Sequence, residues 1–275
     1  MTTRELIDEL GSSELYTLHT HTQFCDGRST MAEIVDEGIR HGFTHIGFTP
    51  HSPVPIESPC NMSREDVDDY FREMERLRPA AASHGLKLLA GMEVDWLSAE
   101  WGAHSRYIQN LPLDYRISSV HFIPSQEGRL IDVDGSPESF RKKLSRYFRD
   151  DLRYVVETFF RQSHDSLSAG GFEIIGHFDK IARNGSAVDP DLEEQTWYAD
   201  LVHGLIDHIA EAGVIVEINT KAAGPSRRFF PHRRWWRRLL DLRNPLIVNS
   251  DAHESSLLNA GRPEALAIYR TLKKD

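Results

Sequence analysis

Short apolar segments recur along the chain, and each ends in a polar turn that often carries a histidine. These segments are rich in β-branched and aliphatic residues and therefore predict strands. They are "LYTLHTH", "HIGFTPH", "LKLLAGMEV", "YRISSVHF", "FEIIGHF", "VIVEINT" and "PLIVNSDAH". Between them lie stretches with apolar residues at three- and four-residue spacing, such as "TMAEIVDEGIRHG", "REDVDDYFREMERLRPAAASHG" and "TWYADLVHGLIDHIAEAG", which predict helices. Alternating strands and helices predict an α/β fold, either a closed (β/α) barrel or an open doubly wound sheet.

Three of the helical patterns stop at a glycine just before the next strand, at Gly42, Gly85 and Gly213. A glycine there suits a left-handed helix cap, although it could also be merely flexible. No linker-like or low-complexity stretch interrupts the alternation over 275 residues, which is close to the usual length of one α/β barrel. We therefore expect one domain over residues 1–275.

The charge and the cysteines limit the class of protein. The formal net charge of −10 argues against a general binder of nucleic acid or membrane surfaces, while leaving room for a local basic pocket that binds an anionic substrate. Cys25 and Cys60 form no CxxC motif, which favours free thiols in a reducing compartment. The N-terminus lacks the apolar core of a signal peptide, and no long apolar run follows. We expect a soluble, cytoplasmic protein; its oligomeric state is not specified by the sequence.

Histidines gather at the ends of the predicted strands, where barrels and doubly wound sheets build their active sites. The histidines in this position are His19, His21, His51, His121, His177 and His253. A single strand-end histidine is more often a hydrogen-bonded core or loop residue. Because the carboxyl ends of parallel strands lie at the same end of a barrel or the same edge of a sheet, we expect all six histidines to lie close together there.

Three carboxylates stand at the same level: Glu93 and Asp251 end predicted strands, and Asp26 follows the first histidine pair. Side chains alternate with period two along a strand, so His19 and His21 point the same way, as do Asp251 and His253 if the strand stays extended. Other interpretations are a salt-bridged acid at Glu93, a helix N-cap at Asp251 and an ordinary turn around Asp26.

Imidazoles and carboxylates without a thiolate cluster suit zinc, manganese or iron(II). Nine such groups are more than one tetrahedral ion needs. We therefore expect two or three divalent ions, with Glu93 or Asp251 as a bridging ligand.

Two segments depart from the simple alternation. "PSQEGRLIDVDGSPESF" has the composition of a hairpin-like insertion beside a strand-to-helix loop. "GPSRRFFPHRRWWRRLLDLRNP" concentrates arginines among aromatic residues between Arg227 and Arg238. One interpretation is a helix from about His232 to Leu242 that buries Trp235, Leu239 and Leu242 and keeps its arginines in solvent. The other is a basic rim that steers phosphate substrates to a nearby site.

The ordered set "HTH", "TPHSP", "GMEVD", "SVHF", "GHFD" and "NSDAH" resembles the polymerase-and-histidinol-phosphatase (PHP) superfamily of metal-dependent phosphoesterases. The tail from "VEINTKAAG" to "AGRPEAL" is similar to the histidinol-phosphatase branch. The resemblance implies a distorted (β/α)7 barrel with up to three metal ions at the C-terminal mouth of the strands. The implied metal ligands are His19, His21, Asp26, His51, Glu93, His121, His177, Asp251 and His253.

For a phosphate monoester, such a site implies attack on phosphorus by a metal-bridging hydroxide, in line with the leaving alkoxide. Glu93, Asp251 and His253 are the expected catalytic residues, and His253 is either a ligand or the acid for the leaving group. Arg183 and Arg262 are candidates to bind the phosphoryl group, or are surface ion-pair residues. No covalent nucleophile is needed.

The expected activity is a histidinol-phosphatase, which releases inorganic phosphate from L-histidinol phosphate in histidine biosynthesis. The alternative is a related phosphoesterase that acts on another small phosphate ester or a short phosphodiester. A non-enzymatic domain that supports a larger assembly is a third possibility. The expected partner is therefore a small phosphorylated substrate, with no nucleic acid and no membrane.

Overall fold

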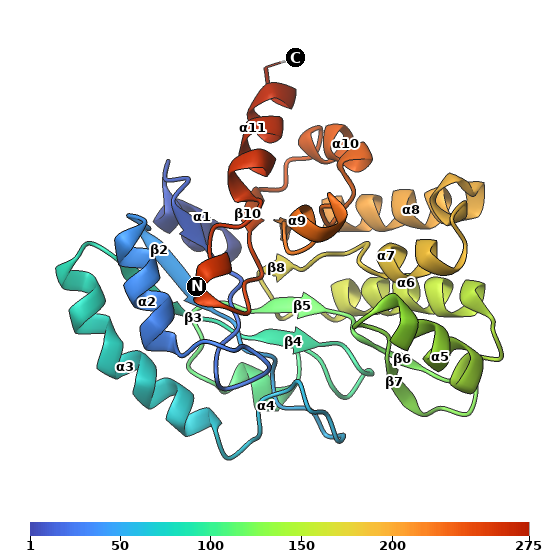
Figure 1. Cartoon of the computed structure of the whole chain (residues 1–275), viewed down its shortest axis with the longest axis horizontal. Coiled ribbons are helices and arrows are strands. Elements are labelled where there is room, and N and C mark those ends of the chain that lie inside the picture. The colour runs from blue at the N-terminus through green and yellow to red at the C-terminus, as the bar shows by residue number, and fades with distance from the viewer. Residues whose placement is uncertain (275) are drawn as a thin grey trace.

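The structure is a computed structural model that describes residues 1–274, with only the backbone described at residues 225 and 226. Its eight parallel strands form two sheets (Figure 1). The first sheet has the order β1 (Tyr16–Thr17), β2 (His45–Phe48) and β3 (Lys87–Ala90). The second has the order β10 (Leu246–Asn249), β9 (Ile215–Asn219), β8 (Ile174–Ile175), β5 (Ile117–Ser119) and β4 (Glu93–Asp95). These parallel sheets confirm the predicted α/β class.

The two sheets are joined at both sides by parallel bridges, Thr20 with Ala252 and His51 with Glu93. The segment predicted as one strand, "LKLLAGMEV", is divided at Gly91 between β3 and β4, which pair with different neighbours. A Cβ atom at Gly91 would lie 2.6 Å from the Tyr115 ring. The backbone must therefore pass this ring closely, and only glycine leaves room for that.

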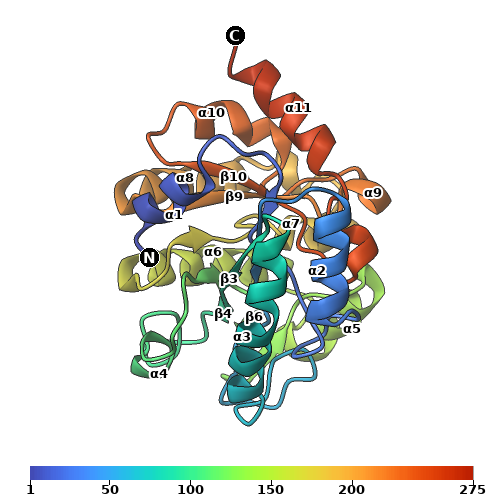
Figure 2. The same ribbon diagram turned by 90° about the vertical axis from the view of Figure 1, so that its left-hand side faces the viewer.

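Helices connect the strands and cover their outer faces. They are α1 (Thr3–Leu10), α2 (Met31–Arg40), α3 (Val67–Ser83), α4 (Arg106–Gln109), α5 (Pro137–Phe148), α6 (Leu152–Ala169), α7 (Ile181–Val188), α8 (Thr196–Ala212), α9 (Ala223–Ser226), α10 (Trp236–Leu240) and α11 (Arg262–Leu272). Three 3₁₀ turns, η1 (Leu192–Glu194), η2 (Arg233–Trp235) and η3 (Ser255–Leu257), complete the described helical elements. Figure 2 shows α2 and α3 side by side outside the first sheet. None of the described helices is both long and apolar enough to cross a membrane.

The period of two along the strands separates two cores. In β9, Ile215 belongs to an inner cluster with Leu18, Tyr115 and Ile247, while Val216 and Ile218 belong to the larger outer cluster that packs against the helices. Leu6 and Leu10 of α1 belong to the same inner cluster, which forms an apolar floor. Residues above this apolar floor on the inner faces therefore point into the site.

The predicted insertion is confirmed as an antiparallel hairpin, β6 (Phe122–Pro124) with β7 (Leu130–Asp132), after which α5 begins. Gly42, Gly85 and Gly213 all have positive φ angles, as expected of left-handed caps.

The arginine-rich segment forms η2 and α10, with Trp235 and Leu239 buried as predicted and Leu242 only half-buried. On this helix Arg234 pairs with Glu194 and Arg238 pairs with Asp207, whereas Arg228, which precedes the helix, is mostly buried against Glu193. These pairs favour the first interpretation, a solvated helix face, over a free basic rim.

Candidate metal centre

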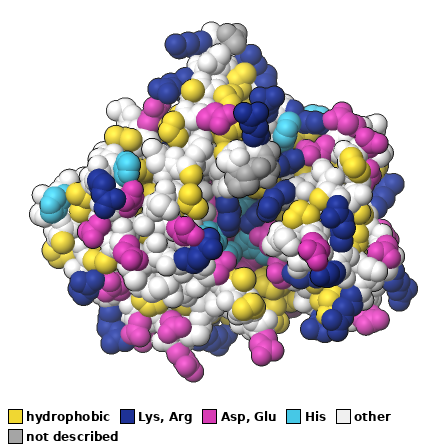
Figure 3. All heavy atoms as spheres, viewed as in Figure 1, with side chains coloured by type: hydrophobic (Ala, Val, Ile, Leu, Met, Phe, Trp, Pro, Cys, Tyr) yellow, Lys and Arg dark blue, Asp and Glu magenta, His cyan; other side chains and the backbone are white. Residues whose placement is uncertain are grey.

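A cavity of about 1000 Å³ opens where the strands end, and Figure 3 shows histidines at the bottom of this hollow with lysine and arginine side chains around it. Its wall includes His51 after β2, His121 after β5, Lys180 after β8, Lys221 after β9 and His253 after β10. The carboxyl ends of the parallel strands thus supply the polar residues of one cavity, as expected for this fold class.

Glu93, at the start of β4, lies at the centre of the histidines, and its carboxylate is buried. The Oε1 atom lies 2.9 Å from Nε2 of His177 and 3.6 Å from Nε2 of His121. The Oε2 atom lies 3.2 to 3.3 Å from a ring nitrogen of each of three further histidines: His19, His21 and His51. One carboxylate therefore faces five imidazoles, the position of a bridging ligand.

Asp251 provides the second buried carboxylate. Its Oδ1 atom lies 3.2 Å from Nε2 of His21 and 3.8 Å from Nε2 of His19. The φ angle of Asp251 is 50°, so the extended conformation assumed for Asp251 and His253 does not continue past β10. The aspartate adopts a left-handed conformation instead, which this residue type tolerates better than most, and both side chains still reach the site.

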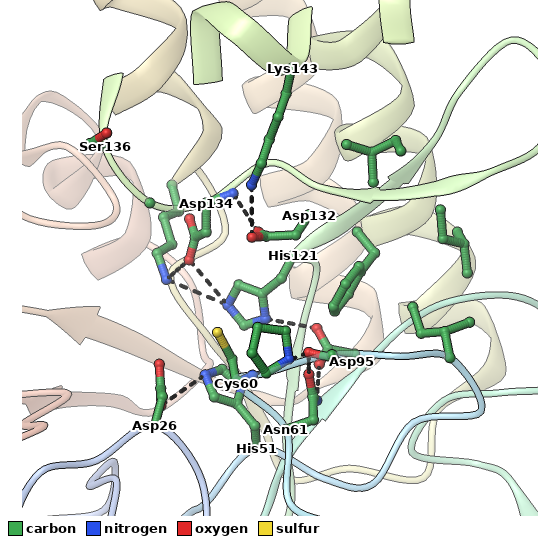
Figure 4. Close-up of a pocket in the computed structure, with 18 of the residues that line it drawn as sticks. Asp26, His51, Cys60, Asn61, Asp95, His121, Asp132, Asp134, Ser136 and Lys143 are labelled. Carbon is green, nitrogen blue, oxygen red and sulfur yellow. Dashed lines mark hydrogen bonds and ion pairs between the residues drawn. The ribbon is translucent and has the colours of Figure 1, made fainter. Parts of the chain in front are cut away.

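Asp26 joins the outer side of the cluster and is the most exposed of the carboxylates, with 31% of its side-chain surface accessible. Its Oδ1 atom lies 3.3 Å from Nε2 of His253, 3.5 Å from Nδ1 of His21 and 3.8 Å from Nε2 of His51. Figure 4 shows Asp26 and His51 directed toward each other at the edge of the cavity.

Ligand-forming atoms from all nine predicted residues fall into overlapping groups whose members lie within 4.8 Å of one another. The groups are His21, Asp26, His51 and His253; His19, Glu93 and His177; His19, His21 and Asp251; and His51, Glu93 and His121. The structure therefore brings together every residue expected to bind metal.

Two carboxylates that the sequence interpretation missed orient these imidazoles. Glu217 Oε1 lies 2.7 Å from Nδ1 of His19, and Asp95 Oδ1 lies 2.7 Å from Nδ1 of His121. Each contact directs the opposite nitrogen, Nε2, toward Glu93, in the manner of a carboxylate–histidine pair behind a metal. Both acids lie on inner strand faces, and an acid inside an otherwise apolar strand such as "VIVEINT" is the signal that could have revealed Glu217.

The unsatisfied atoms of the cluster fit metal ions. The buried atoms Nε2 of His19, Nε2 of His21, Nδ1 of His51, Nδ1 of His177 and Oδ1 of Asp26 have no hydrogen-bond partner among the described residues. Leaving several buried polar atoms unpaired at one place is costly, and imidazole and carboxylate donors are those that zinc, manganese or iron(II) accept. The donor set therefore fits divalent ions.

Charges within the protein shift the pKa values of the histidines in two directions. Burial disfavours a charged His19, but Glu217, Glu93 and Asp251 outweigh it and raise the pKa of His19 to about 10. Burial together with His21 and Lys221 lowers the pKa of His253 to about 4. In the absence of metal, the positive charge of protonated imidazoles such as His19 thus neutralises the buried carboxylates. A bound divalent cation would supply this positive charge instead.

Lysines that the sequence interpretation missed flank the cluster. Lys180 Nζ lies 3.4 Å from Nε2 of His121 and 2.6 Å from Asp134 Oδ2. Lys221 Nζ lies 3.0 Å from Nε2 of His253 and 3.3 Å from Asp251 Oδ1. Lys221 stands two residues after β9, and Lys180 stands three residues after the predicted ligand His177. Both positions are ones from which these lysines could have been identified.

The two predicted phosphoryl-binding arginines lie in different places. Arg183, half-buried one turn after Lys180, lines the cavity, and its guanidinium has no partner in the described part of the chain. Arg262 is fully buried elsewhere: it donates hydrogen bonds to the backbone oxygens of Val248 and Glu14 and to the side chain of Asn259. The expectation for Arg262 is therefore corrected, because structural contacts occupy its guanidinium.

A family model described as the PHP domain matches residues 17–221 of the chain. A curated relative, the histidinol-phosphatase of Bacillus subtilis (strain 168), is 24% identical over 254 residues, covering 86% of this chain and 92% of the relative.

Two solved structures share the fold. A candidate histidinol phosphatase, HisK, from Listeria monocytogenes gives a TM-score of 0.76 at 17% identity, covering 90% of this chain and 99% of that one. Histidinol phosphate phosphatase from Lactococcus lactis, solved with Zn, L-histidinol and phosphate, gives a TM-score of 0.71 at 19% identity, covering 94% of each chain.

Proposed function

Because the chain belongs to the PHP domain family, we propose that it is a metal-dependent phosphatase that converts L-histidinol phosphate to L-histidinol and inorganic phosphate. The observation that carries this proposal is the grouping of nine side chains of metal-binding types, Glu93 among them, beside a cavity that Arg183 also lines. The curated relative and the structural neighbours described above support the choice of substrate.

We assign the nine residues of the cluster to two or three divalent ions, zinc, manganese or iron. When bound, such ions neutralise phosphoryl oxygens and activate water for attack at phosphorus. Glu93 would hold the ions together with the five histidines that it faces. Glu217 and Asp95 would keep Nε2 of His19 and His121 available as donors.

The remaining residues of the cavity would position the ester. Arg183 and Lys221 offer positive charge to the phosphoryl oxygens, and a guanidinium can bind two of them at once. His253 lines the cavity and is less buried than most of the cluster, so its ring can face the leaving-group oxygen. We therefore keep Glu93, Asp251 and His253 as the proposed catalytic residues.

We also propose that the two sheets make up one distorted seven-stranded barrel, with β3 and β4 counted as a single interrupted strand. The bridges between Thr20 and Ala252 and between His51 and Glu93 support this closure. His19 and His253, far apart in the sequence, contribute to the same cluster, which supports a single functional unit over residues 1–275.

A substrate panel tests the proposed activity. Protein loaded separately with zinc, manganese or iron(II) is assayed for phosphate release from L-histidinol phosphate, sugar and nucleotide monophosphates, and a short phosphodiester. We expect kcat/KM for histidinol phosphate to exceed the others by about 100-fold or more. A preference for another ester would instead support the alternative phosphoesterase activity.

A further inference from the structure

The cavity extends well beyond the metal-ligand cluster. It continues between the loop 56–61 and the β6–β7 hairpin, where Ile56 and Leu130 add apolar surface to its wall. Figure 4 places Asp132 and Asp134 on one side of His121 and Cys60 on the other. Its volume of about 1000 Å³ exceeds the needs of a phosphoryl group alone. The outer part therefore has room for the organic portion of a substrate.

The carboxylates that line this cavity differ in their partners. Asp134 pairs with Lys180 at 2.6 Å, Asp132 pairs with Lys143 at 2.9 Å, and Asp95 binds His121 and Asn61. Asp26 lies against the histidines of the cluster. The carboxylate of Glu57, by contrast, has no hydrogen-bond or ion-pair partner among residues 1–274.

The cavity thus offers charges of opposite sign that have no hydrogen-bond or ion-pair partner among the described residues: the cations Arg183 and Arg129, the latter over the ring of Tyr147, and the anion Glu57. Arg183 belongs to α7, Arg129 immediately precedes β7, and Glu57 belongs to the loop after β2. A zwitterionic ligand, with a phosphate at one end and a cation further out, matches this arrangement.

We propose that Glu57 forms a subsite for a positively charged amino group on the alcohol portion of the substrate, and that it sets a preference for amine-bearing phosphate monoesters. This inference rests on the proposed phosphatase function. In L-histidinol phosphate, the amino group is on the carbon next to the one that bears the ester oxygen. The apolar wall at Ile56 and Leu130 would then lie against the remainder of the alcohol.

The test compares two esters in three proteins. The esters are L-histidinol phosphate and its deamino analogue, in which hydrogen replaces the ammonium group. The proteins, all metal-loaded, are the wild type, Glu57→Gln and the control Glu127→Gln, which changes an exposed residue of the hairpin turn outside the cavity wall.

We expect Glu57→Gln to lower kcat/KM for histidinol phosphate about tenfold or more, mainly through KM, because a charge-assisted contact is lost. For the deamino analogue, Glu57→Gln should change kcat/KM less than threefold. The control Glu127→Gln should leave kcat/KM for both esters unchanged. Equal effects on both esters, or no effect, in an active wild-type enzyme would overturn the subsite while leaving the phosphatase function intact. A wild type that hydrolyses neither ester would overturn the proposed function, and the subsite with it.

Discussion

Nδ1 of His19 donates a hydrogen bond to Oε1 of Glu217 at 2.7 Å, and both side chains are fully buried. Although burial opposes ionisation of Glu217, His19 lowers the pKa of this carboxyl, so that it remains a carboxylate and accepts the proton of Nδ1. The Nε2 atom of His19 is left facing Glu93 and Asp251. Glu217 therefore fixes the tautomer and direction of a proposed metal ligand without joining the cluster itself.

Glu217→Gln tests this positioning role. A carboxylate can only accept from Nδ1, whereas the neutral amide can either accept through its oxygen or donate through its NH2 group, so it no longer fixes the tautomer of His19. We expect zinc affinity, measured by competition with a chromophoric chelator, to fall by about 10- to 100-fold. The exposed Glu194→Gln variant is the control. Unchanged zinc affinity in a folded Glu217→Gln protein would remove Glu217 from this role.

His51→Ala and Glu93→Ala test the cluster directly. Each change removes a donor atom that faces other members of the cluster, so both variants should lose bound metal and turnover. Circular dichroism should show that both remain folded, because the apolar cores are untouched. Turnover at the wild-type rate in both would exclude these residues from the site.

Arg183→Met and Arg262→Met should have opposite consequences. Arg183 has no partner in the described structure, so its replacement should lower kcat/KM by about 10- to 100-fold with little effect on thermal stability. Replacing Arg262 leaves the buried carbonyl oxygens of Val248 and Glu14 unpaired. The free energy of unfolding of the Arg262→Met protein should therefore fall by about 2 to 4 kcal/mol.

Denaturant titration and steady-state kinetics on both proteins distinguish these roles. A destabilised Arg183→Met protein with normal kcat/KM, or a stable Arg262→Met protein that fails to bind substrate, would reverse the assignment.

His164 and His208, on neighbouring helices α6 and α8, give a dependence of stability on pH. Their Nδ1 atoms lie 2.8 Å apart, which requires one to donate and the other to accept. Burial and His208 lower the pKa of His164. As the pH falls, His164 therefore becomes protonated in the unfolded chain before it does in the folded protein. The contribution of this pair to the free energy of unfolding is present above about pH 6.5 and is lost as the pH falls below that value. The His208→Gln variant should show a weaker decline between about pH 7 and pH 5 in urea titrations; an equally steep decline would contradict the account.

Much of the site follows from the sequence, because strand ends converge in any parallel α/β fold. The alternation of strands and helices, together with six histidines just after strands, places the nine proposed ligand residues in one region without knowledge of the contacts. The spacing of His19 and His21 also follows from the period of two. The left-handed turn at Asp251 does not, because it depends on how the chain leaves β10.

Other features depend on tertiary contacts that no local pattern encodes. The break between β3 and β4 is set by the approach of Tyr115 to Gly91. Arg183 and Arg262 follow predicted ligands at similar distances in the sequence, yet only Arg183 lines the cavity. The sequence does not specify that the first turn of α11 carries Arg262 behind the sheet, where it contacts Val248 and Glu14.

Elemental analysis coupled to a histidinol-phosphate assay tests the central claim most directly. Purified protein should contain about two to three equivalents of zinc, manganese or iron per chain, and chelation should remove metal and phosphate release in parallel. Returning the metal should restore both. Undiminished hydrolysis of histidinol phosphate by protein whose metal content is confirmed to be near zero would contradict the account.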